Sequence, residues 1–265
     1  NHESASAYAQ RAAFWWWVSQ TTANPAEAAQ ASAEARKDVA AALEKSPTHL
    51  ESLLISADIA LHDGDLPRAK EALASAEKTS PDDRRVWISL VNWSRLTGDA
   101  KNEETYLKRL AEVDPSWLSE LAELYLSRQP PDLAATRQVV LRMQRARFPS
   151  QHLQFWQARL TFLQGDRVKG LRGLEELYQS IVRESDPLKE WVGLALAEAY
   201  FQVGMRESAG AVISQLRESA PDSPRVRTAW AKWLLQTGQA ETAISEFQGI
   251  SSSVSSQRLF ASGGY

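Results

Sequence analysis

Side chains that could carry out chemistry are few in this chain of 265 residues, and their spacing fits no catalytic or metal site. The four histidines are scattered, and none has a second His or a carboxylate at metalloprotease spacing. The nearest metal-like pair, His62 and Asp63, is adjacent in sequence and therefore splayed on a helix. The chain has no cysteine, which excludes thiolate ligands and disulfides, and no phosphate-binding loop or nucleophile elbow. We expect no catalysis, no metal and no cofactor.

Charged side chains are better suited to binding, because they are distributed unevenly along the chain. Residues 1–127 carry a net charge of −7, whereas residues 128–172 hold nine basic and two acidic side chains. A candidate basic patch within that stretch comprises Arg137, Arg142, Arg145 and Arg147. It could attract an acidic partner or an anionic polymer, or it could be ordinary solvated surface. Nucleic acid is disfavoured, since the rest of the chain is acidic and contains no recognition motif.

The elements that position these side chains are predicted to be helices. Strong helix formers, namely Ala, Leu, Glu, Arg and Gln, dominate the composition, while Gly (12) and Pro (11) are scarce. We expect an all-α protein in which Gly and Pro mark the ends of helices.

The prolines and glycines recur with a period of 34 residues. Prolines recur 34 residues apart at Pro47, Pro81, Pro115 and Pro149, and then after 38 and 34 residues at Pro187 and Pro221. Glycines lie 16 or 17 residues after most of them, at Gly64, Gly98, Gly165, Gly204 and Gly238. Each half period therefore predicts one helix of three to four turns, with Gly ending the first helix of each pair and Pro following the second. An Asp after the Gly, as in Gly64-Asp65, is suited to cap the next helix.

This period resembles the tetratricopeptide repeat family, whose unit is a 34-residue helix-turn-helix with a small residue early in the second helix. Ala35, Ala69 and Ala209 stand at that position, whereas Glu103 and Arg137 depart from it. The resemblance implies a right-handed α-solenoid of about six to seven units. Two irregularities are expected: Gln129-Pro130-Pro131-Asp132 replaces the turn glycine of the third full unit, and extra residues lengthen the second helix of the fourth by about one turn.

We expect four segments along the chain. Residues 1–49 form a degenerate helical pair with an aromatic cluster, and residues 50–223 form five repeat units. Residues 224–250 form a final pair, and residues 251–265 form a serine-rich tail. The aromatic cluster Phe14–Trp17 is too short to span a membrane, although Trp clusters favour membrane interfaces. It is predicted either to contact a membrane weakly or to be buried under the next repeat.

In the resembled family the first helix of each unit lines a concave groove that binds protein segments. This implies groove positions at Arg85, Asn92, Arg95, Trp156, Trp191, Glu198 and Lys232. The residues also expected to face inward are Glu51, Asp58, His62, Glu123, Leu126, Leu160 and Arg225. Binding of a chaperone C-terminal tail is not expected, because Glu51 and Asp58 stand where cations are wanted.

Most tryptophans are predicted to be structural. Trp87, Trp230 and Trp233 fall on apolar helical stripes and are expected in the core. Trp156 and Trp191 lie at helix positions that are expected to face the groove. They would therefore either anchor a partner or be partly buried between units.

The resemblance implies an interaction scaffold that binds a protein or peptide. The alternatives are a spacer or self-assembling element of a larger complex, such as one in the bacterial envelope, and binding of an anionic polymer by the Arg128–Arg172 stretch. Arg outnumbers Lys, which hints at a bacterial source. Cytoplasm and periplasm or envelope are equally compatible with the sequence, and further repeats, an anchor or other domains could flank this segment.

Overall fold

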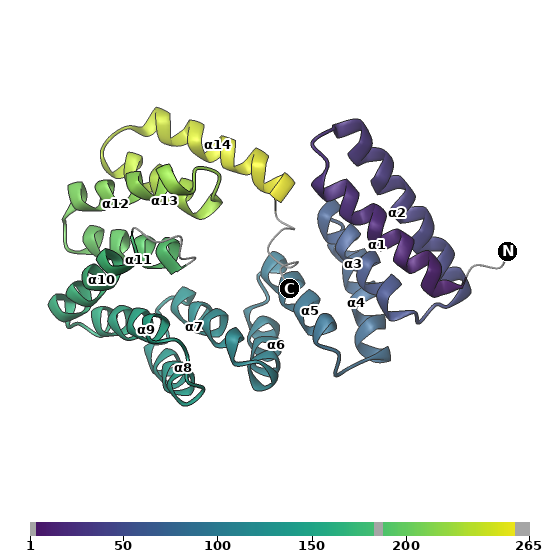
Figure 1. The fold of residues 1–265 in the computed structure, drawn as a ribbon, viewed down its shortest axis with the longest axis horizontal. Coiled ribbons are helices and arrows are strands. Elements are labelled where there is room, and N and C mark those ends of the chain that lie inside the picture. Colours follow the sequence, from purple (N-terminus) through teal and green to yellow (C-terminus); the bar gives the residue numbers. More distant parts are fainter. Residues whose placement is uncertain (1–3, 183–187, 258–265) are drawn as a thin grey trace. The chain divides into compact units, whose positions relative to one another are not determined.

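The computed structural model describes residues 4–182 and 188–257, with side chains described as far as Gly249. In these ranges the chain forms α-helices, one 3-10 helix and no strand, which confirms the all-α prediction. Two compact units, divided between Trp117 and Leu118, are described separately below. The helices of unit 1 are α1 (Ala5–Thr21), α2 (Pro25–Lys45), α3 (Leu50–Asp63), α4 (Leu66–Thr79), α5 (Arg84–Thr97), α6 (Ala100–Val113) and the 3-10 helix η1 (Pro115–Trp117) (Figure 1). Those of unit 2 are α7 (Leu118–Ser127), α8 (Leu133–Arg145), α9 (Ser150–Leu163), α10 (Arg167–Ile181), α11 (Leu188–Gln202), α12 (Arg206–Ser219), α13 (Pro224–Gln236) and α14 (Ala240–Gln257).

Turns within the helix pairs have the predicted chemistry. The glycines of the 17-residue series adopt positive φ, with φ 74° at Gly64 and 71° at Gly98. A Cβ atom would meet nothing within 4 Å at either position, so backbone conformation rather than crowding requires glycine there. Asp65, Asp99 and Asp166 each accept a hydrogen bond from a backbone N–H of the following helix, confirming the predicted caps.

The turn without glycine, between α7 and α8, is closed by other groups. The backbone N–H of Asp132 donates to the carbonyl oxygen of Tyr125 at 2.9 Å. The carboxylate of Asp132 in turn accepts from the N–H of Ala135 at 2.9 Å and caps α8. Asp132 therefore closes the connection between α7 and α8 through its backbone N–H and caps α8 through its side chain.

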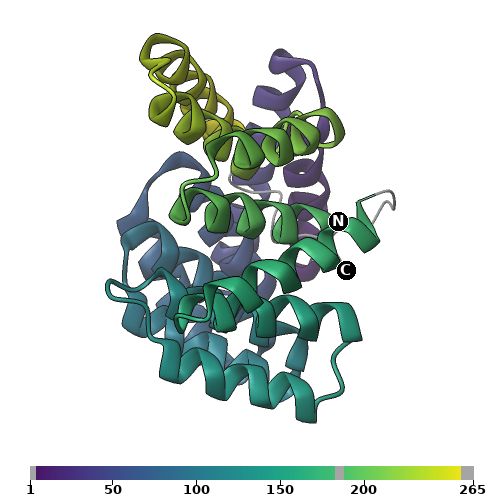
Figure 2. The same ribbon diagram turned by 90° about the vertical axis from the view of Figure 1, so that its left-hand side faces the viewer.

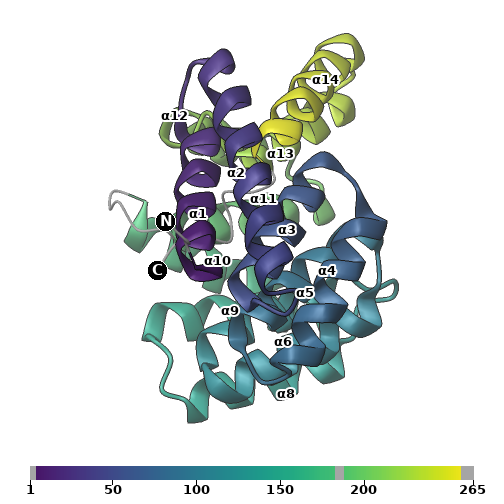
Figure 3. The same cartoon turned by 90° about the vertical axis from the view of Figure 1, so that its right-hand side faces the viewer.

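In unit 1, each helix packs against its neighbours along the chain, and α3 also contacts α1 and α5. Figure 3 shows α1, α2 and α3 side by side. Small residues at the contacts, such as Ala12, Ala35 and Ala57, are fully buried and let the helices approach closely. Leu53, Leu73 and Val86 fill the space between α3, α4 and α5.

An ion pair that the sequence does not reveal joins α1 to α2. Both carboxylate oxygens of Asp38 accept hydrogen bonds from Arg11, from Nε and Nη2 at 2.7 Å each. The Asp38 side chain is only 2% exposed, whereas that of Arg11 is 44% exposed. Arg11 is the one charged residue of α1, so this pair is the main polar link of that helix to the rest of the unit.

The two halves of this ion pair should differ in their effect on stability. Arg11→Ala leaves a buried carboxylate without its cation and should lower the free energy of unfolding by about 3 kcal/mol. Asp38→Asn leaves an arginine that can still reach water and should cost about half as much. Urea unfolding of both variants at neutral pH checks this order. Equal costs, or a larger cost for Asp38→Asn, would contradict it.

In unit 2, helices again pack against sequence neighbours, and α11 also contacts both α9 and α13. Figure 2 shows these helices, coloured teal to yellow, stacked one over another. Phe155, Tyr178 and Leu196 are among the largest fully buried side chains. Tight contacts at Gly170 and Gly173 of α10 bring that helix unusually close to α9. The core of unit 2 therefore combines large aromatic side chains with close helix crossings.

Three details differ from the sequence predictions. Helix α10 has 15 residues, only one more than α12, so the predicted lengthening by one turn is wrong. The other four extra residues of this repeat follow Ile181, and residues 183–187 lie outside the described ranges. Helix α14 continues to Gln257, through part of the predicted tail, since serine only mildly disfavours helix and residues 251–257 contain no Pro or Gly. Trp87 is buried as predicted, but Trp230 and Trp233 are only partly buried.

Candidate functional site

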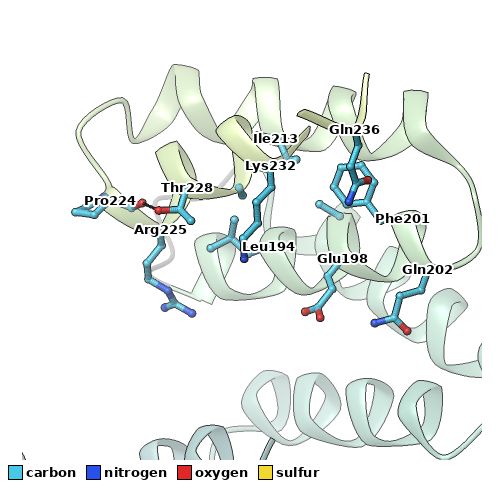
Figure 4. Close-up of a pocket in the computed structure, with 12 residues that line it drawn as sticks. Leu194, Glu198, Phe201, Gln202, Ile213, Pro224, Arg225, Thr228, Lys232 and Gln236 are labelled. Atoms are coloured by element: carbon cyan, nitrogen blue, oxygen red, sulfur yellow. Dashed lines mark hydrogen bonds between the residues drawn. The ribbon is translucent and has the colours of Figure 1, made fainter. Parts of the chain in front are cut away.

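A groove in unit 2 lies between α11 and α13, the first helices of two successive pairs. It encloses about 640 Å³ and is lined on its apolar side by Leu194, Ala197, Phe201, Ile213 and Ala229. Ile213 comes from α12, which packs against both helices and closes the groove from behind. Figure 4 shows that Arg225, Lys232 and Glu198 extend from the two helices toward the same open side. The groove thus combines an apolar floor with a charged margin.

The repeat period explains how this groove is built. Trp191 and Arg225 are 34 residues apart, and so are Glu198 and Lys232, so each pair occupies equivalent positions on α11 and α13. Each helix also repeats its contribution after seven residues, from Leu194 to Phe201 and from Arg225 to Lys232. Seven residues are close to two helical turns, so these side chains share one face.

The prediction named Glu198 and Lys232 as groove residues, and both line this groove. Both side chains are exposed, and neither has an ion-pair partner in the described part of the chain. Arg225, which was expected only to face inward, also lines the groove. Leu194, Phe201 and Gln236 were not predicted as groove residues. The seven-residue spacing relates Phe201 to Leu194, and the 34-residue period relates Gln236 to Gln202, which also lines the groove.

Arg225 is held at the entrance of the groove by an aromatic ring. Its guanidinium carbon lies 3.7 Å from the ring centroid of Trp191, a close cation–π stack. Arg225 Nε is 4.0 Å from Glu190 Oε1, at the outer limit of an ion pair. The described residues accept no hydrogen bond from this guanidinium, and 45% of the Arg225 side-chain surface is exposed. The stack orients the group, and the side chain is still partly open to solvent.

A smaller hollow of about 170 Å³ lies beside Trp191, between α7, α9 and α11. It is lined by Ser119, His152, Phe155, Trp156, Leu188 and Trp191. The prediction that Trp156 could anchor a partner is not supported by its burial, because only 2% of its surface is exposed. Leu160 of the same helix is buried as well. Helix α9 is covered by α8, α10 and α11, so side chains in its expected groove phase point into the core.

Near that hollow, an arginine close to an aromatic ring is already neutralised. Arg159 lies with its guanidinium carbon 5.7 Å from the ring centroid of Trp156, and its Nη1 forms a short ion pair with the carboxylate of Glu123 on α7. The Arg159 side chain is 17% exposed. This part of unit 2 therefore satisfies its own charge, unlike the groove at Arg225.

The predicted groove residues of unit 1 are partly occupied by internal contacts. Arg85 donates from Nη2 to Asp83 at 2.8 Å, and this hydrogen bond holds the pKa of the Asp83 carboxyl below its usual value. Arg95 donates from Nε to Glu103 on α6 at 2.6 Å. Asn92 is half-buried. Arg85 and Arg95 thus bind separate acidic residues and do not form one cationic cluster.

Asp58 on α3 is the most perturbed acidic residue in unit 1. Some of its surface reaches solvent, but the surrounding atoms remove most of the hydration of the carboxylate, and this desolvation raises its pKa to about 7. In the described residues it has no ion-pair partner that would offset the loss. A carboxylate in this position weakens the folded state when it is charged.

Two other predicted surfaces, the basic patch on α8 and the aromatic cluster on α1, contain exposed side chains. Arg137, Arg145 and Arg147 are exposed on or just after α8, and Arg142 is half-buried. Phe14 and Trp17 on α1 are 54% and 61% exposed. Among the described helices, none is both long enough and apolar enough to cross a membrane. In the same residues no cluster of three His, Asp or Glu side chains could hold a metal ion.

Comparison with known proteins agrees on the fold. No family model matches the chain, and no curated protein sequence matches it. A solved tetratricopeptide repeat protein from Parabacteroides merdae is similar over 94% of this chain and 98% of its own, with a TM-score of 0.66 and 17% identity. PilF from Pseudomonas aeruginosa has a TM-score of 0.54 and 14% identity over 86% of this chain and 97% of its own. PilW, a type IV pilus biogenesis factor, has a TM-score of 0.54 and 18% identity over 85% of this chain and 98% of its own.

Proposed function

Because the chain has the tetratricopeptide repeat fold, we propose that it is a protein-interaction scaffold whose groove between α11 and α13 binds a segment of a partner protein. The observation that carries this proposal is the groove itself, with its apolar floor and its three charged side chains directed outward. Pockets that bind a segment combine apolar contact area with a few polar groups that fix orientation. The proposal assigns no catalytic step to the chain.

A helix or an extended segment would be held mainly by its apolar side chains. Leu194, Phe201 and Ala229 are partly exposed at the floor, so water now covers apolar surface that a partner could bury. Each methylene group removed from water contributes about 0.8 kcal/mol. Two or three apolar side chains on a partner are therefore enough for measurable affinity after the cost of association.

Changes to the floor should weaken binding without unfolding the chain. Leu194→Gln replaces apolar floor with an amide, and Ala229→Trp fills the groove with a bulky ring. The 265-residue chain is used to select peptides from a displayed random library, and the affinities of the selected peptides are measured by fluorescence anisotropy. We expect both variants to weaken binding at least tenfold, about 1.4 kcal/mol. Circular dichroism melting confirms that the variants remain folded.

A matched control variant introduces the same tryptophan side chain outside the groove. Ala211→Trp adds a tryptophan on the exposed face of α12, outside the groove, and should leave peptide affinity unchanged. Peptides that bind both groove variants as tightly as the wild-type chain would refute the groove as the binding site.

The alternative of a spacer or self-assembling element predicts a different result in light scattering. A groove filled by a second copy gives a mass that rises with concentration, and trimming residues 251–265 should remove this rise if the end of the chain mediates assembly. Binding of an anionic polymer by the Arg128–Arg172 stretch predicts salt-sensitive binding that charge reversal at Arg142 and Arg145 abolishes. Binding of an anionic polymer predicts no sensitivity to Leu194→Gln, whereas self-assembly through the groove predicts that this variant also removes the rise in mass with concentration.

A further inference from the structure

We propose that Arg225 recognises an acidic side chain of the partner, placed at a fixed spacing from an apolar side chain that lies on the groove floor. This inference rests on the proposed function and specifies the chemistry of the bound segment. The occupant is an internal segment with an Asp or Glu carboxylate at the Arg225 end of the groove. The argument depends on the state of the Arg225 guanidinium and on the order of charges along α11 and α13.

The Arg225 guanidinium is oriented and available. The face-on contact with Trp191, at 3.7 Å from the ring centroid, restricts the plane of the guanidinium before any partner binds. A planar guanidinium can donate two parallel hydrogen bonds to one carboxylate, and a carboxylate is the group that best matches this fork. Because stacking has already removed part of the side-chain freedom, less entropy is lost on binding.

The nearest internal carboxylate does not satisfy this guanidinium. Glu190 Oε1 approaches only Nε, at 4.0 Å, which is too long for a hydrogen bond. Arg159 offers a contrast in the same unit, since Glu123 pairs closely with its Nη1 and its side chain is largely covered. Glu123 thus neutralises Arg159, whereas in the described residues no carboxylate accepts a hydrogen bond from Arg225 at the groove.

Charges along the groove set the order of the partner's residues. Arg225 lies near the start of α13, Lys232 follows two turns later, and Glu198 stands at the position on α11 equivalent to Lys232 (Figure 4). A carboxylate of the partner is attracted at Arg225, but one placed farther along meets Glu198. A basic side chain is favoured beside Glu198 and opposed by Lys232. The bound segment is therefore acidic at the Arg225 end and apolar over Leu194, with no second acidic residue facing Glu198.

The test uses the peptides selected on the 265-residue chain. We expect an Asp or Glu to be enriched at a fixed spacing from an apolar residue, and its replacement by Asn or Gln to weaken binding at least tenfold. Arg225→Ala should cause a similar loss. Arg225→Lys should recover only part of the affinity, because it keeps the charge but not the fork. Arg206→Ala, which removes an exposed arginine of α12 outside the groove, is the charge control and should change nothing.

A charge reversal at Glu198, together with the peptide sequences that it selects, tests the order of charges. Glu198→Lys should shift selection toward peptides that carry a second acidic residue beyond the apolar one, on the side away from Arg225. Unchanged peptide sequences after this reversal would overturn the proposed order. The peptides are also compared with free and amidated C-termini. Amidation should have no effect, and a tenfold loss on amidation would show that a terminal carboxylate binds instead, which overturns the proposal.

The outcomes separate this inference from the proposed function. Peptides that lose affinity with Leu194→Gln but not with Arg225→Ala would leave the scaffold function in place and refute recognition of an acidic side chain. Peptides insensitive to both variants would refute both. Loss with Arg225→Ala, but not with Arg206→Ala, supports both.

Discussion

Asp58→Asn should make the chain more stable at about pH 8 and should flatten the dependence of its stability on pH. The carboxyl group of Asp58 keeps its proton up to a pKa of about 7 in the folded chain, against 3.8 for an ordinary aspartate. The folded state therefore binds more protons than the unfolded state between these values. Stability from this group is complete below a pH of about 4, falls as pH rises, and reaches its minimum above a pH of about 7.

The size of this effect is limited by how far the pKa of Asp58 in the folded chain lies above its unfolded value. A tenfold change in proton affinity corresponds to about 1.4 kcal/mol, so a rise in pKa from 3.8 to about 7 sets a ceiling of about 4 kcal/mol. Some solvent reaches Asp58, so the measured value should be smaller. Asparagine has nearly the same shape without the charge, which leaves packing unchanged.

Urea unfolding from acid to mildly alkaline pH provides the measurement. The difference in unfolding free energy between Asp58→Asn and the wild-type chain should grow as pH rises and become constant above about pH 8. Asp82→Asn, an exposed aspartate of the same unit, is the control and should show no such growth. A variant less stable than wild type at alkaline pH would contradict the interpretation of Asp58 as a desolvated carboxylate.

Gly170→Ala should be among the most damaging single substitutions in unit 2. A Cβ atom at Gly170 would lie 2.5 Å from both Cα and Cβ of Phe162 and would also overlap its backbone nitrogen. Because the backbone of α9 cannot move aside as a flexible side chain can, α9 and α10 would have to separate. Overpacking of this kind costs about 3 kcal/mol or more, which outweighs the gain of about 1 kcal/mol in helix propensity from Gly to Ala.

Two further glycines provide a graded comparison. A Cβ at Gly173 would meet the Cβ of Ala158 at 2.9 Å, so Gly173→Ala should cost less than Gly170→Ala. At Gly249 the nearest atom is Nη2 of Arg227, at 2.6 Å, the far end of a side chain that can shift. Gly249→Ala should therefore be neutral or slightly stabilising. Chemical unfolding of the three variants should give this order, and a mild effect at Gly170 would refute the close backbone contact.

Features that depend on nearby residues could be predicted from the sequence. Gly64 and Asp65 determine a left-handed turn and a helix cap within a few residues, so the 34-residue period revealed the helix pairs. The resemblance to the tetratricopeptide repeat family implied groove positions for Glu198 and Lys232, and both residues line the groove between α11 and α13.

Features that depend on how much a particular helix is covered could not be predicted. Trp156 shares the groove phase of its repeat, but α9 is enclosed by α8, α10 and α11, and the ring fills the gap between helices. The Arg11–Asp38 ion pair joins residues 27 apart on two helices, and no local pattern marks it. The 34-residue period relates Trp191 to Arg225, but the stacking of the two side chains depends on their directions. The sequence does not reveal those directions.

In each unit, the extensive helix contacts join helices that are only one or two places apart along the chain. Tension applied to the two ends therefore loads these contacts in series, and one hairpin can detach without first breaking distant contacts. A unit built from such contacts is expected to lengthen under force one hairpin at a time. The same hairpins can re-form one at a time on neighbours that are still folded when the load is removed.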